Sequence, residues 1–259
     1  MEYLWAFSSE FLKIRRTWAF TLSGAVPLGV SLFIFAVTVM RVSDGQWNDV
    51  WTYYLRGVGY SWLLMMTPFY LALLLALLAS VDLNAGAWKL LLSQPVSRAP
   101  LYVAKLGVAL LLAAWSQAVL AGSCLGLGLL LPKLRPHLGG YQLGVDVRHF
   151  LAMLAFAYVA GFLIMAIHAW ISIRSSNFVP SLAVVIFAEI ANVLGMRDES
   201  LQRWWPWLYP FDAVRLYGLQ LRDAVQHFWS VPHLILASVL GAIVITLLAL
   251  WDFARREVL

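Results

Sequence analysis

The stretch LYVAKLGVALLLAAWSQAVLAGSCLGLGLLL, residues 101–131, decides the fold class of this chain. Apart from Lys105 near its start it contains no charged residue, and most of its side chains are aliphatic or small. A helix that crosses the hydrocarbon core of a bilayer needs about 20 mainly apolar residues. The stretch therefore predicts a transmembrane helix, with enough length for tilt or for an extension beyond the bilayer.

Further apolar stretches lie on both sides of it in the chain. They occupy residues 18–40, 60–81, 150–173, 178–196 and 233–252. Segment 178–196 is the least typical, because it is short, has Pro180 near its start and contains Glu189. The runs are continuous rather than alternating with a period of two, which favours helices over the strands of a membrane barrel. We therefore predict an all-α membrane protein with six transmembrane helices in one transmembrane domain, residues 1–259.

The composition of the whole chain agrees with this class of protein. Of the 259 residues, 62% are hydrophobic and 12% are charged, whereas soluble domains contain about 25% charged residues. The long apolar runs exclude disorder, and the single cysteine, Cys124, excludes a disulfide scaffold. The net charge of +5 comes from basic residues scattered between apolar segments, which favours contact with membrane lipids over binding of nucleic acid.

Residues 1–17 are expected to form an amphipathic helix at the membrane interface. They do not form a cleavable signal peptide with the run that follows, because that run is too long for a signal-peptide core. One side of a helix would carry apolar residues and the other side polar ones. The apolar set is Leu4, Phe7, Phe11 and Ile14, and the polar set is Glu2, Ser9, Glu10, Lys13 and Arg16. A disordered cytosolic tail is the alternative.

Charge around the first apolar run indicates the orientation. The 18 Lys and Arg residues divide evenly between the two sides of the bilayer, so their total does not decide it. However, Lys13, Arg15 and Arg16 precede the first run, and Arg41 follows it. With an even number of spans, this bias predicts that both termini are cytosolic in a multi-pass protein of the inner membrane.

An aromatic segment, residues 197–232, precedes the last apolar run and is too polar to span the membrane. Amphipathic aromatic rings favour the headgroup level, so we expect this segment in the outer interface. Pro206, Pro210 and Pro232 would divide it into short helices, such as one over residues 211–226. The aromatic rings are Trp204, Trp205, Trp207, Tyr209 and Phe211. Binding of a ligand by this cluster is the alternative to membrane anchoring.

Two ionisable residues lie inside the expected spans. Ionisable groups in a membrane usually face a bundle interior, a polar cavity or a partner. Glu189 is a candidate for lining a pathway or pairing helices, and a structural hydrogen bond is equally expected. For His168 we favour a structural hydrogen bond. Phosphate-loop, zinc-protease and nucleophile-elbow motifs are absent, and the five histidines lack metal-ligand spacing, so no catalytic or metal site is expected.

Gly122 and Gly126 form a G-x-x-x-G pair within residues 101–131. Because glycine has no side chain, such a pair lets another helix approach closely. We expect a helix-packing face here, within the chain or between chains.

Residues 82–98 connect the second and third apolar runs on the expected cytosolic side. Asn84 is suited to cap a short helix there, and Pro95 to end it. Its apolar side would carry Trp88, Leu91 and Leu92. Such a helix is suited to docking in a groove of a partner protein; taken alone, the pattern also fits a second interfacial helix.

The stretch GAWKLLLSQPVSRAPLYVAK, residues 86–105, resembles the G-T-x-K-x-L-L-x-x-P-x-S-R…K signature of ABC-2 type transporter permeases. The pattern of Glu10, Lys13 and Arg16 is similar to the E-x-x-K-x-x-R start of that family, and WPWLYP, residues 205–210, resembles its outer segment. Two positions depart from the pattern. Ala87 stands where threonine is usual, and Asp82 only approximates the acidic residue expected just before the glycine.

The resemblance implies the membrane subunit of an ATP-binding cassette exporter for a hydrophobic or amphipathic substrate, such as a peptide, drug or lipid. Two copies of a separate ATPase subunit would bind ATP and Mg²⁺, and this chain would bind no cofactor. The permease would form a homodimer or pair with a related permease. The expected coupling helix and its flanks comprise Asp82, Asn84, Gly86, Trp88, Lys89, Leu91, Leu92, Pro95 and Arg98. A membrane anchor or assembly protein without transport is the alternative.

Overall fold

The computed structural model describes residues 2–14, 17–41, 50–84, 98–134, 147–175, 177–195, 204–216 and 231–255. Within these ranges all regular secondary structure is helical. The α-helices are α1 (Glu2–Ile14), α2 (Trp18–Arg41), α3 (Val50–Gly59), α4 (Thr67–Asn84), α6 (Arg98–Leu134), α7 (Val147–Ala160), α8 (Phe162–Arg174), α9 (Val179–Gly195), α11 (Tyr209–Leu216) and α12 (Val231–Arg255). A π-helix, η1 (Tyr60–Met66), links α3 to α4, and a 3₁₀ turn, η2 (Pro206–Leu208), precedes α11.

The chain is a multi-pass membrane protein. Its described part contains 5 helical stretches that are long and apolar enough to cross a membrane. They are Trp18–Arg41, Tyr53–Val81, Ala99–Leu131, Phe150–Arg174 and His233–Arg255. The remaining expected span corresponds to α9, which is apolar but has 17 residues, equivalent to about 25 Å at 1.5 Å per residue. The hydrocarbon core is about 30 Å thick, so α9 falls short of the length expected for a sixth full span.

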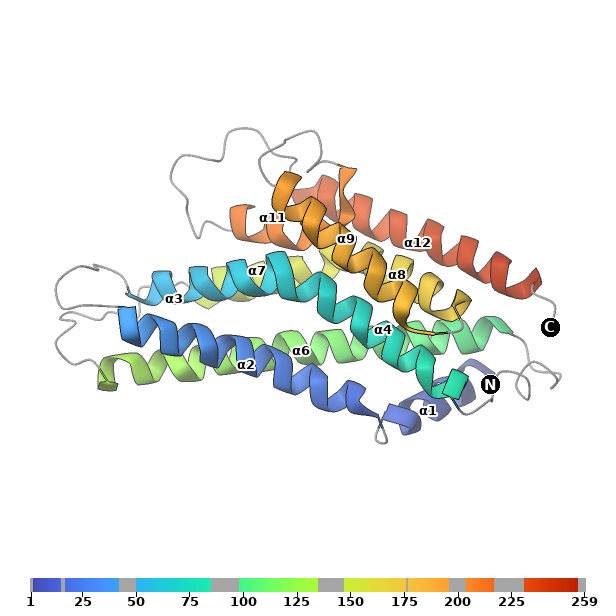
Figure 1. The fold of residues 1–259 in the computed structure, drawn as a ribbon, viewed down its shortest axis with the longest axis horizontal. Helices are drawn as coiled ribbons and strands as arrows, with labels where there is room; N and C mark the ends of the chain where they lie inside the picture. The colour runs from blue at the N-terminus through green and yellow to red at the C-terminus, as the bar shows by residue number, and fades with distance from the viewer. Residues whose placement is uncertain are drawn as a thin grey trace.

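The helices form an elongated bundle (Figure 1). Helix α2 packs along α6, α12 packs along α8, and α4 contacts α8 and α9. Helix α1, the C-terminal end of α4, the N-terminal end of α6 and the C-terminal end of α12 all lie at one end of this bundle (Figure 1). We call it the α1 end. This arrangement brings the expected interfacial helix close to both helices that flank residues 85–97.

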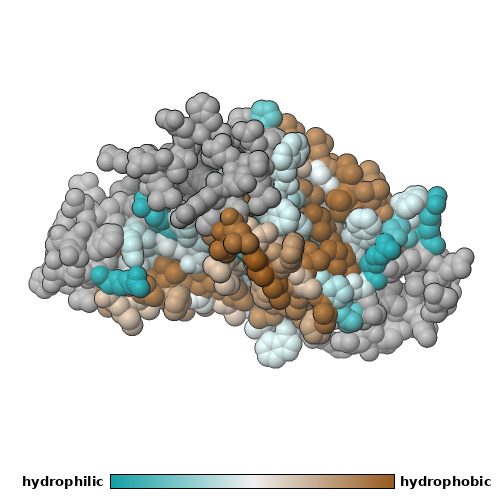
Figure 2. Space-filling model, turned by 45° about the horizontal axis from the view of Figure 1, so that its top comes forward, coloured by the Kyte–Doolittle hydropathy of each residue, from teal (hydrophilic) through white to brown (hydrophobic). Residues whose placement is uncertain are grey.

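The outward face of the bundle is hydrophobic. Helices α2 and α12 are the least buried spans, and Phe33, Leu240 and Leu247 are more than half exposed. Figure 2 shows hydrophobic residues over the middle of one face and hydrophilic residues toward its two ends. That distribution is the one a bilayer requires, because lipid chains cover the apolar middle and water meets the ends.

One expected span is two helices. The run 150–173 breaks at Gly161, where α7 ends and α8 begins. Ser238 of α12, which is fully buried, forms hydrogen bonds with backbone groups on both sides of this break. Its Oγ lies 3.0 Å from the carbonyl of Val159 and 2.9 Å from that of Ala160, and accepts from the N–H of Leu163 at 3.3 Å. Backbone groups inside a membrane need such partners because water is excluded.

The described part of the aromatic segment, residues 204–216, includes buried aromatic rings. Trp207, Tyr209 and Phe211 are buried, whereas Trp204 is 75% exposed. The ring of Phe211 packs edge-on against Tyr60 of η1, with a centroid distance of 5.1 Å. The structure thus places Trp207, Tyr209 and Phe211 in contacts within the protein and leaves Trp204 exposed, while their position relative to the membrane stays a prediction. Helix α11 covers the first part of the expected helix 211–226, and residues 217–226 lie outside the described ranges.

Candidate functional site

A buried ion pair joins α1 to α6 at the α1 end. Lys105 donates from Nζ to Oε2 of Glu10 at 2.8 Å, and the two side chains are 5% and 3% exposed. Lys105 also donates to the carbonyl oxygen of Leu78 in α4 at 2.9 Å. The second oxygen of Glu10, Oε1, accepts from Lys13 at 2.5 Å. We call Glu10, Lys13, Lys105 and the Leu78 carbonyl the clasp, because together they connect α1, α4 and α6.

Burial makes the clasp sensitive to the loss of either charge. Removing a charge from water costs several kcal/mol, and pairing recovers that cost only with good geometry. Glu10 meets this condition with both carboxylate oxygens. Taking away one member of a buried pair typically costs about 3–5 kcal/mol, because the other charge stays buried. Lys13, whose side chain is 32% exposed, contributes less because solvent screens it.

The backbone next to Lys105 allows this close approach. A Cβ atom at Gly107 would lie 3.3 Å from Cε2 of Phe7, so a larger residue would press on that ring. Phe7 in turn stacks with Phe11 at a centroid distance of 6.4 Å. The small residue on α6 and the aromatic ring on α1 therefore set the distance at which Glu10 meets Lys105.

The clasp lies near both ends of the expected coupling region. Leu78 precedes Asn84, the last residue of α4, by about 9 Å of helix, and Lys105 follows Arg98, the first residue of α6, by about 10 Å. Any displacement of the chain between these helix ends acts on two helices that Lys105 holds together. The third helix held there is α1.

The structure describes only the flanks of the expected coupling helix. Asp82 and Asn84 lie in the last turn of α4, and Arg98 begins α6. Asn84 is the last residue of α4, and the helix that it is expected to cap lies outside the described residues. The other coupling candidates lie outside the described residues: Gly86, Trp88, Lys89, Leu91, Leu92 and Pro95.

Glu10 lies on a different side of α1 from the one expected. We placed it on a polar face pointing away from the apolar residues, but it faces α6 and is buried, while Leu4 and Phe11 are exposed. The physical reason is Lys105, which offers a buried Glu10 a charge partner. Arg16, the last member of the expected pattern, lies outside the described residues.

A second charged group at the same end holds α12 to α8. The indole Nε1 of Trp170 donates to Oδ2 of Asp252 at 2.9 Å, and Arg174 approaches both carboxylate oxygens at 3.3 Å. Our sequence reasoning used Asp252 only as the end of a span. An acidic residue at the end of one span and Arg174 at the end of another were the signal available for this pair.

His168 connects three segments in the interior of the bundle. It is fully buried. The indole of Trp207 donates to its Nε2 at 3.2 Å, which leaves the proton on Nδ1 for the hydroxyl of Ser181 at 2.9 Å. Through these bonds the neutral imidazole links α8 to α9 and to η2, in keeping with the structural hydrogen bonding that we favoured.

Glu189 belongs to a polar chain between α9 and the aromatic segment. Its Oε2 accepts from Asn192 at 3.3 Å, and the amide oxygen of Asn192 accepts from the indole of Trp205 at 2.8 Å. Its Oε1 is buried without a hydrogen-bond partner among the described residues. The sequence singled out Glu189, and it named Trp205 only as an aromatic ring; the link through Asn192 was not predicted, since an amide and an indole are common in loops and interfaces.

Comparison with known proteins decides the family. The family model described as ABC-2 family transporter protein matches residues 6–192. This chain belongs to the ABC-2 transporter family. No curated protein and no solved structure matches it.

The matched part of the permease contains the clasp and both flanks of residues 85–97. Helix α12 and the aromatic segment lie beyond it. The partners Trp207 of His168 and Asp252 of Arg174 therefore come from outside the matched range.

The permease is a membrane transport component rather than a catalyst. Within the described ranges, no three His, Cys, Asp or Glu side chains come together as a metal site would require. The polar groups that the structure brings together instead join helices to one another.

Proposed function

We propose that this permease is the membrane subunit of an ATP-binding cassette exporter. Two copies of a separate ATPase subunit would dock at the α1 end and bind ATP and Mg²⁺. Two permease chains, identical or related, would enclose the pathway. In this arrangement the α1 end and both termini face the cytosol, in the inner membrane of the cell.

The clasp is the observation that carries the proposal. Lys105 connects the helices on both sides of residues 85–97 and attaches them to α1. Force applied by a partner to that segment would therefore reach α1, α4 and α6 together. A segment serving only as a membrane anchor has no need of buried charges that join three helices, because packing of apolar faces suffices for anchoring.

In a transport cycle, the energy for changing the shape of the bundle comes from tighter binding of ATP to one conformation of the complex than to another. ATP must favour one arrangement of the bundle over another, and a ligand shifts an equilibrium only by its difference in affinity for the two states. To change the ratio of two conformations from about 1:99 to 99:1, a ligand must bind one of them more tightly by roughly 5.5 kcal/mol. The partner ATPase supplies this difference in the proposed cycle, since the permease sequence has no phosphate-binding loop.

The exposed surface favours a hydrophobic or amphipathic cargo. Apolar side chains cover α2, α9 and α12, and the polar side chains of the bundle lie mainly between helices. A peptide, drug or lipid that enters from the bilayer would meet few unpaired charges on this surface.

Co-purification tests the proposal. The permease should bring down a separately encoded ATPase, and the double variant Trp88→Ala, Leu91→Ala should weaken that association and lower the ATP hydrolysis of the complex. Removing two apolar anchors from a docking helix commonly costs more than 2 kcal/mol of binding energy. We therefore expect a loss of association of at least about tenfold.

The control is the double variant Trp115→Ala, Leu111→Ala, which removes the same two residue types from the membrane-spanning part of α6. Both side chains are about half exposed, so that variant should keep the ATPase. Full association and full hydrolysis in the Trp88, Leu91 variant would overturn the coupling assignment. A permease that brings down no ATPase at all would point to a membrane anchor or assembly protein.

A further inference from the structure

A small cavity of about 10 Å³ lies inside the membrane-spanning part of the chain. Thr67 and Trp62 line it from one span, Ser116 and Gln117 from a second, and Gly161 from a third. Each of these residues is near the middle of its span, Tyr53–Val81, Ala99–Leu131 and Phe150–Arg174 respectively. The cavity therefore lies close to the centre of the bilayer, far from bulk water on either side.

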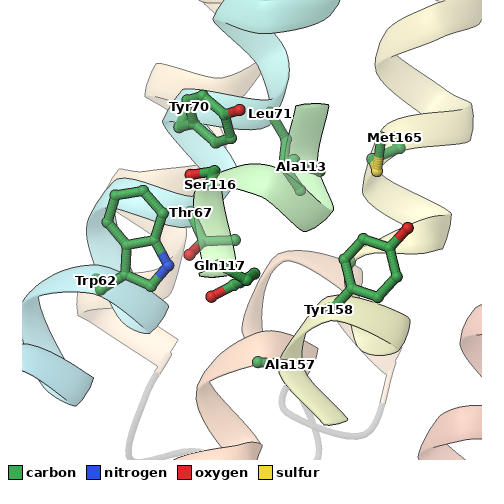
Figure 3. A pocket seen from close by; sticks show the side chains of 11 residues that line it. Trp62, Thr67, Tyr70, Leu71, Ala113, Ser116, Gln117, Ala157, Tyr158 and Met165 are labelled. Atoms are coloured by element: carbon green, nitrogen blue, oxygen red, sulfur yellow. The ribbon is translucent and has the colours of Figure 1, made fainter. Parts of the chain in front are cut away.

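Unpaired polar atoms point into this cavity. Four buried atoms have no hydrogen-bond partner in the described part of the chain: the indole Nε1 of Trp62, the hydroxyls of Thr67 and Ser116, and the amide Oε1 of Gln117. Trp62 is 1% exposed and Thr67 is 2% exposed. Figure 3 shows the nitrogen of Trp62 directed toward Thr67 and Gln117. Four unsatisfied groups around one space indicate that a partner is missing, since buried polar groups are nearly always paired.

The two tyrosine hydroxyls at the cavity already have partners. Tyr70 lies 2.8 Å from the hydroxyl of Ser23, and Tyr158 donates to the carbonyl of Leu110 at 3.1 Å. The unmet hydrogen-bonding capacity is therefore concentrated on Trp62, Thr67, Ser116 and Gln117.

Helix geometry gives the cavity its shape. The N–H of Thr67 bonds to the carbonyl of Trp62, an i to i+5 contact that closes the π-helix η1. Regular α-helix would pair residues four apart. On the opposite wall α7 gives way to α8 at Gly161, where a Cβ would lie 3.2 Å from Cδ1 of Leu71. Single π turns occur frequently at functional sites, and here the π turn lines the same space as a helix break.

The lining determines the chemistry of the occupant. The indole N–H only donates, the amide oxygen only accepts, and the threonine and serine hydroxyls do both. No carboxylate, amine, guanidinium or imidazole is among the lining residues, so a charged group would find no counter-charge there. The free volume is close to that of one water molecule. The matching group is neutral, has a single oxygen, and both accepts and donates a hydrogen bond.

We propose that this cavity binds one neutral hydroxyl oxygen, which accepts from Trp62 and donates to Gln117 beside Thr67. A water molecule and the hydroxyl group of an amphipathic molecule share this chemistry. The occupant connects η1 to α6 at the centre of the membrane. The site depends on residues of this chain alone and stands whether or not an ATPase couples to residues 85–97.

The isosteric change Thr67→Val tests whether the cavity is occupied, because it should lower the Tm of an occupied site and raise the Tm of an empty one. In an occupied site the change removes a hydrogen-bond partner and should lower the Tm of the purified permease by about 2–4 °C, the shift typical of one such bond in a protein of this size. In an empty site it removes an unpaired hydroxyl and should raise the Tm. Thr38→Val is the matched control, because the buried hydroxyl of Thr38 has a known partner, the carbonyl of Ile34 at 2.8 Å.

Added amphiphiles distinguish the two sources of the oxygen. We would compare 1-decanol with decyl methyl ether, which has the same alkyl chain but no hydroxyl hydrogen. If decanol alone raises the Tm of the wild type, and Thr67→Val and Gln117→Met abolish that rise, the hydroxyl of an amphiphile occupies the site. If neither compound acts but Thr67→Val lowers the Tm, the oxygen is that of water.

Two results would overturn the proposal. One is a Tm that stays the same or rises in Thr67→Val while decanol has no specific effect. The other is a high-resolution density map of the wild-type protein without a peak between Trp62 Nε1 and Gln117 Oε1. The map also keeps the proposal testable if the variants do not fold.

Discussion

At the residue scale, the clasp shows how a buried charge is stabilised within an apolar helix bundle. Glu10 and Lys105 are 95 residues apart in the chain, and each loses its hydration on burial. Their direct bond, with Lys13 on one side and the Leu78 carbonyl on the other, replaces the water that each charge has lost. A buried network of this kind is stable while all its members are present, and removal of one member is costly because it leaves another charge buried without its partner.

We predict that Glu10→Gln destabilises the permease, because Lys105 then remains buried beside a neutral amide. The free energy of unfolding should fall by about 3 kcal/mol or more. Adding Lys105→Met removes the orphaned charge and should recover part of the loss, by about 0.5–3 kcal/mol of coupling. Thermal unfolding of the purified variants measures both effects.

Glu2→Gln is the control for this series, because Glu2 is an exposed acid on the same helix. A surface change of this kind typically stays within about 0.5 kcal/mol. If Glu10→Gln unfolds with the stability of the wild type, the ion pair contributes nothing and the clasp does not hold α1.

Residue contacts of this kind lie beyond what one sequence predicts. Its polar neighbours on α1 suggested that Glu10 faces outward, and only the distant Lys105 explains why it faces inward. The residue types were informative, since Glu10 and Lys105 both belong to motifs that resemble those of the permease family. Their pairing required the fold, because helical spacing describes one helix at a time and says nothing of the next.

At the scale of elements, continuous apolar runs predicted the helices well. Helices α2 and α12 lie within a few residues of the expected segments 18–40 and 233–252. The breaks were not predicted, because a glycine such as Gly161 is common in membrane helices and carries no sign of a break by itself. The break at Gly161 is stabilised by Ser238, which belongs to another helix and forms hydrogen bonds with backbone groups at the break.

We predict that Ser238→Ala loosens the contact of α12 with the α7–α8 break. The carbonyls of Val159 and Ala160 and the N–H of Leu163 would lose a shared partner in a region without water. An unsatisfied buried group costs about 1–3 kcal/mol, and we expect a loss of stability in that range. Ser8→Ala, on the exposed side of α1, is the control and should have little effect. Equal stability of both variants by thermal unfolding would contradict the role given to Ser238.

At the scale of the whole molecule, three glycines of α2 and α6 have open space beside them. A Cβ atom at Gly122 or Gly126 of α6 would meet nothing within 4 Å, and the same holds for Gly29 of α2. The G-x-x-x-G pair therefore does not serve packing among the described helices of the chain. Small residues that no neighbour covers suit the close approach of a helix from a second chain.

We predict that Gly122→Ile weakens pairing of two permease chains without harming the fold of either. The added side chain finds open space within the chain, so thermal stability of the single chain should be close to that of the wild type. Across a close helix contact the same side chain would push the backbones apart, and we expect pairing at least about tenfold weaker. Counting subunits by photobleaching in lipid nanodiscs, over a range of protein-to-lipid ratios, measures this directly. Ala155→Ile, an exposed position on α7, controls for bulk added to a lipid-facing surface. If Gly122→Ile pairs like the wild type, two chains meet elsewhere, and the exposed side of α9 around Phe187, Ile190 and Leu194 becomes the surface to test.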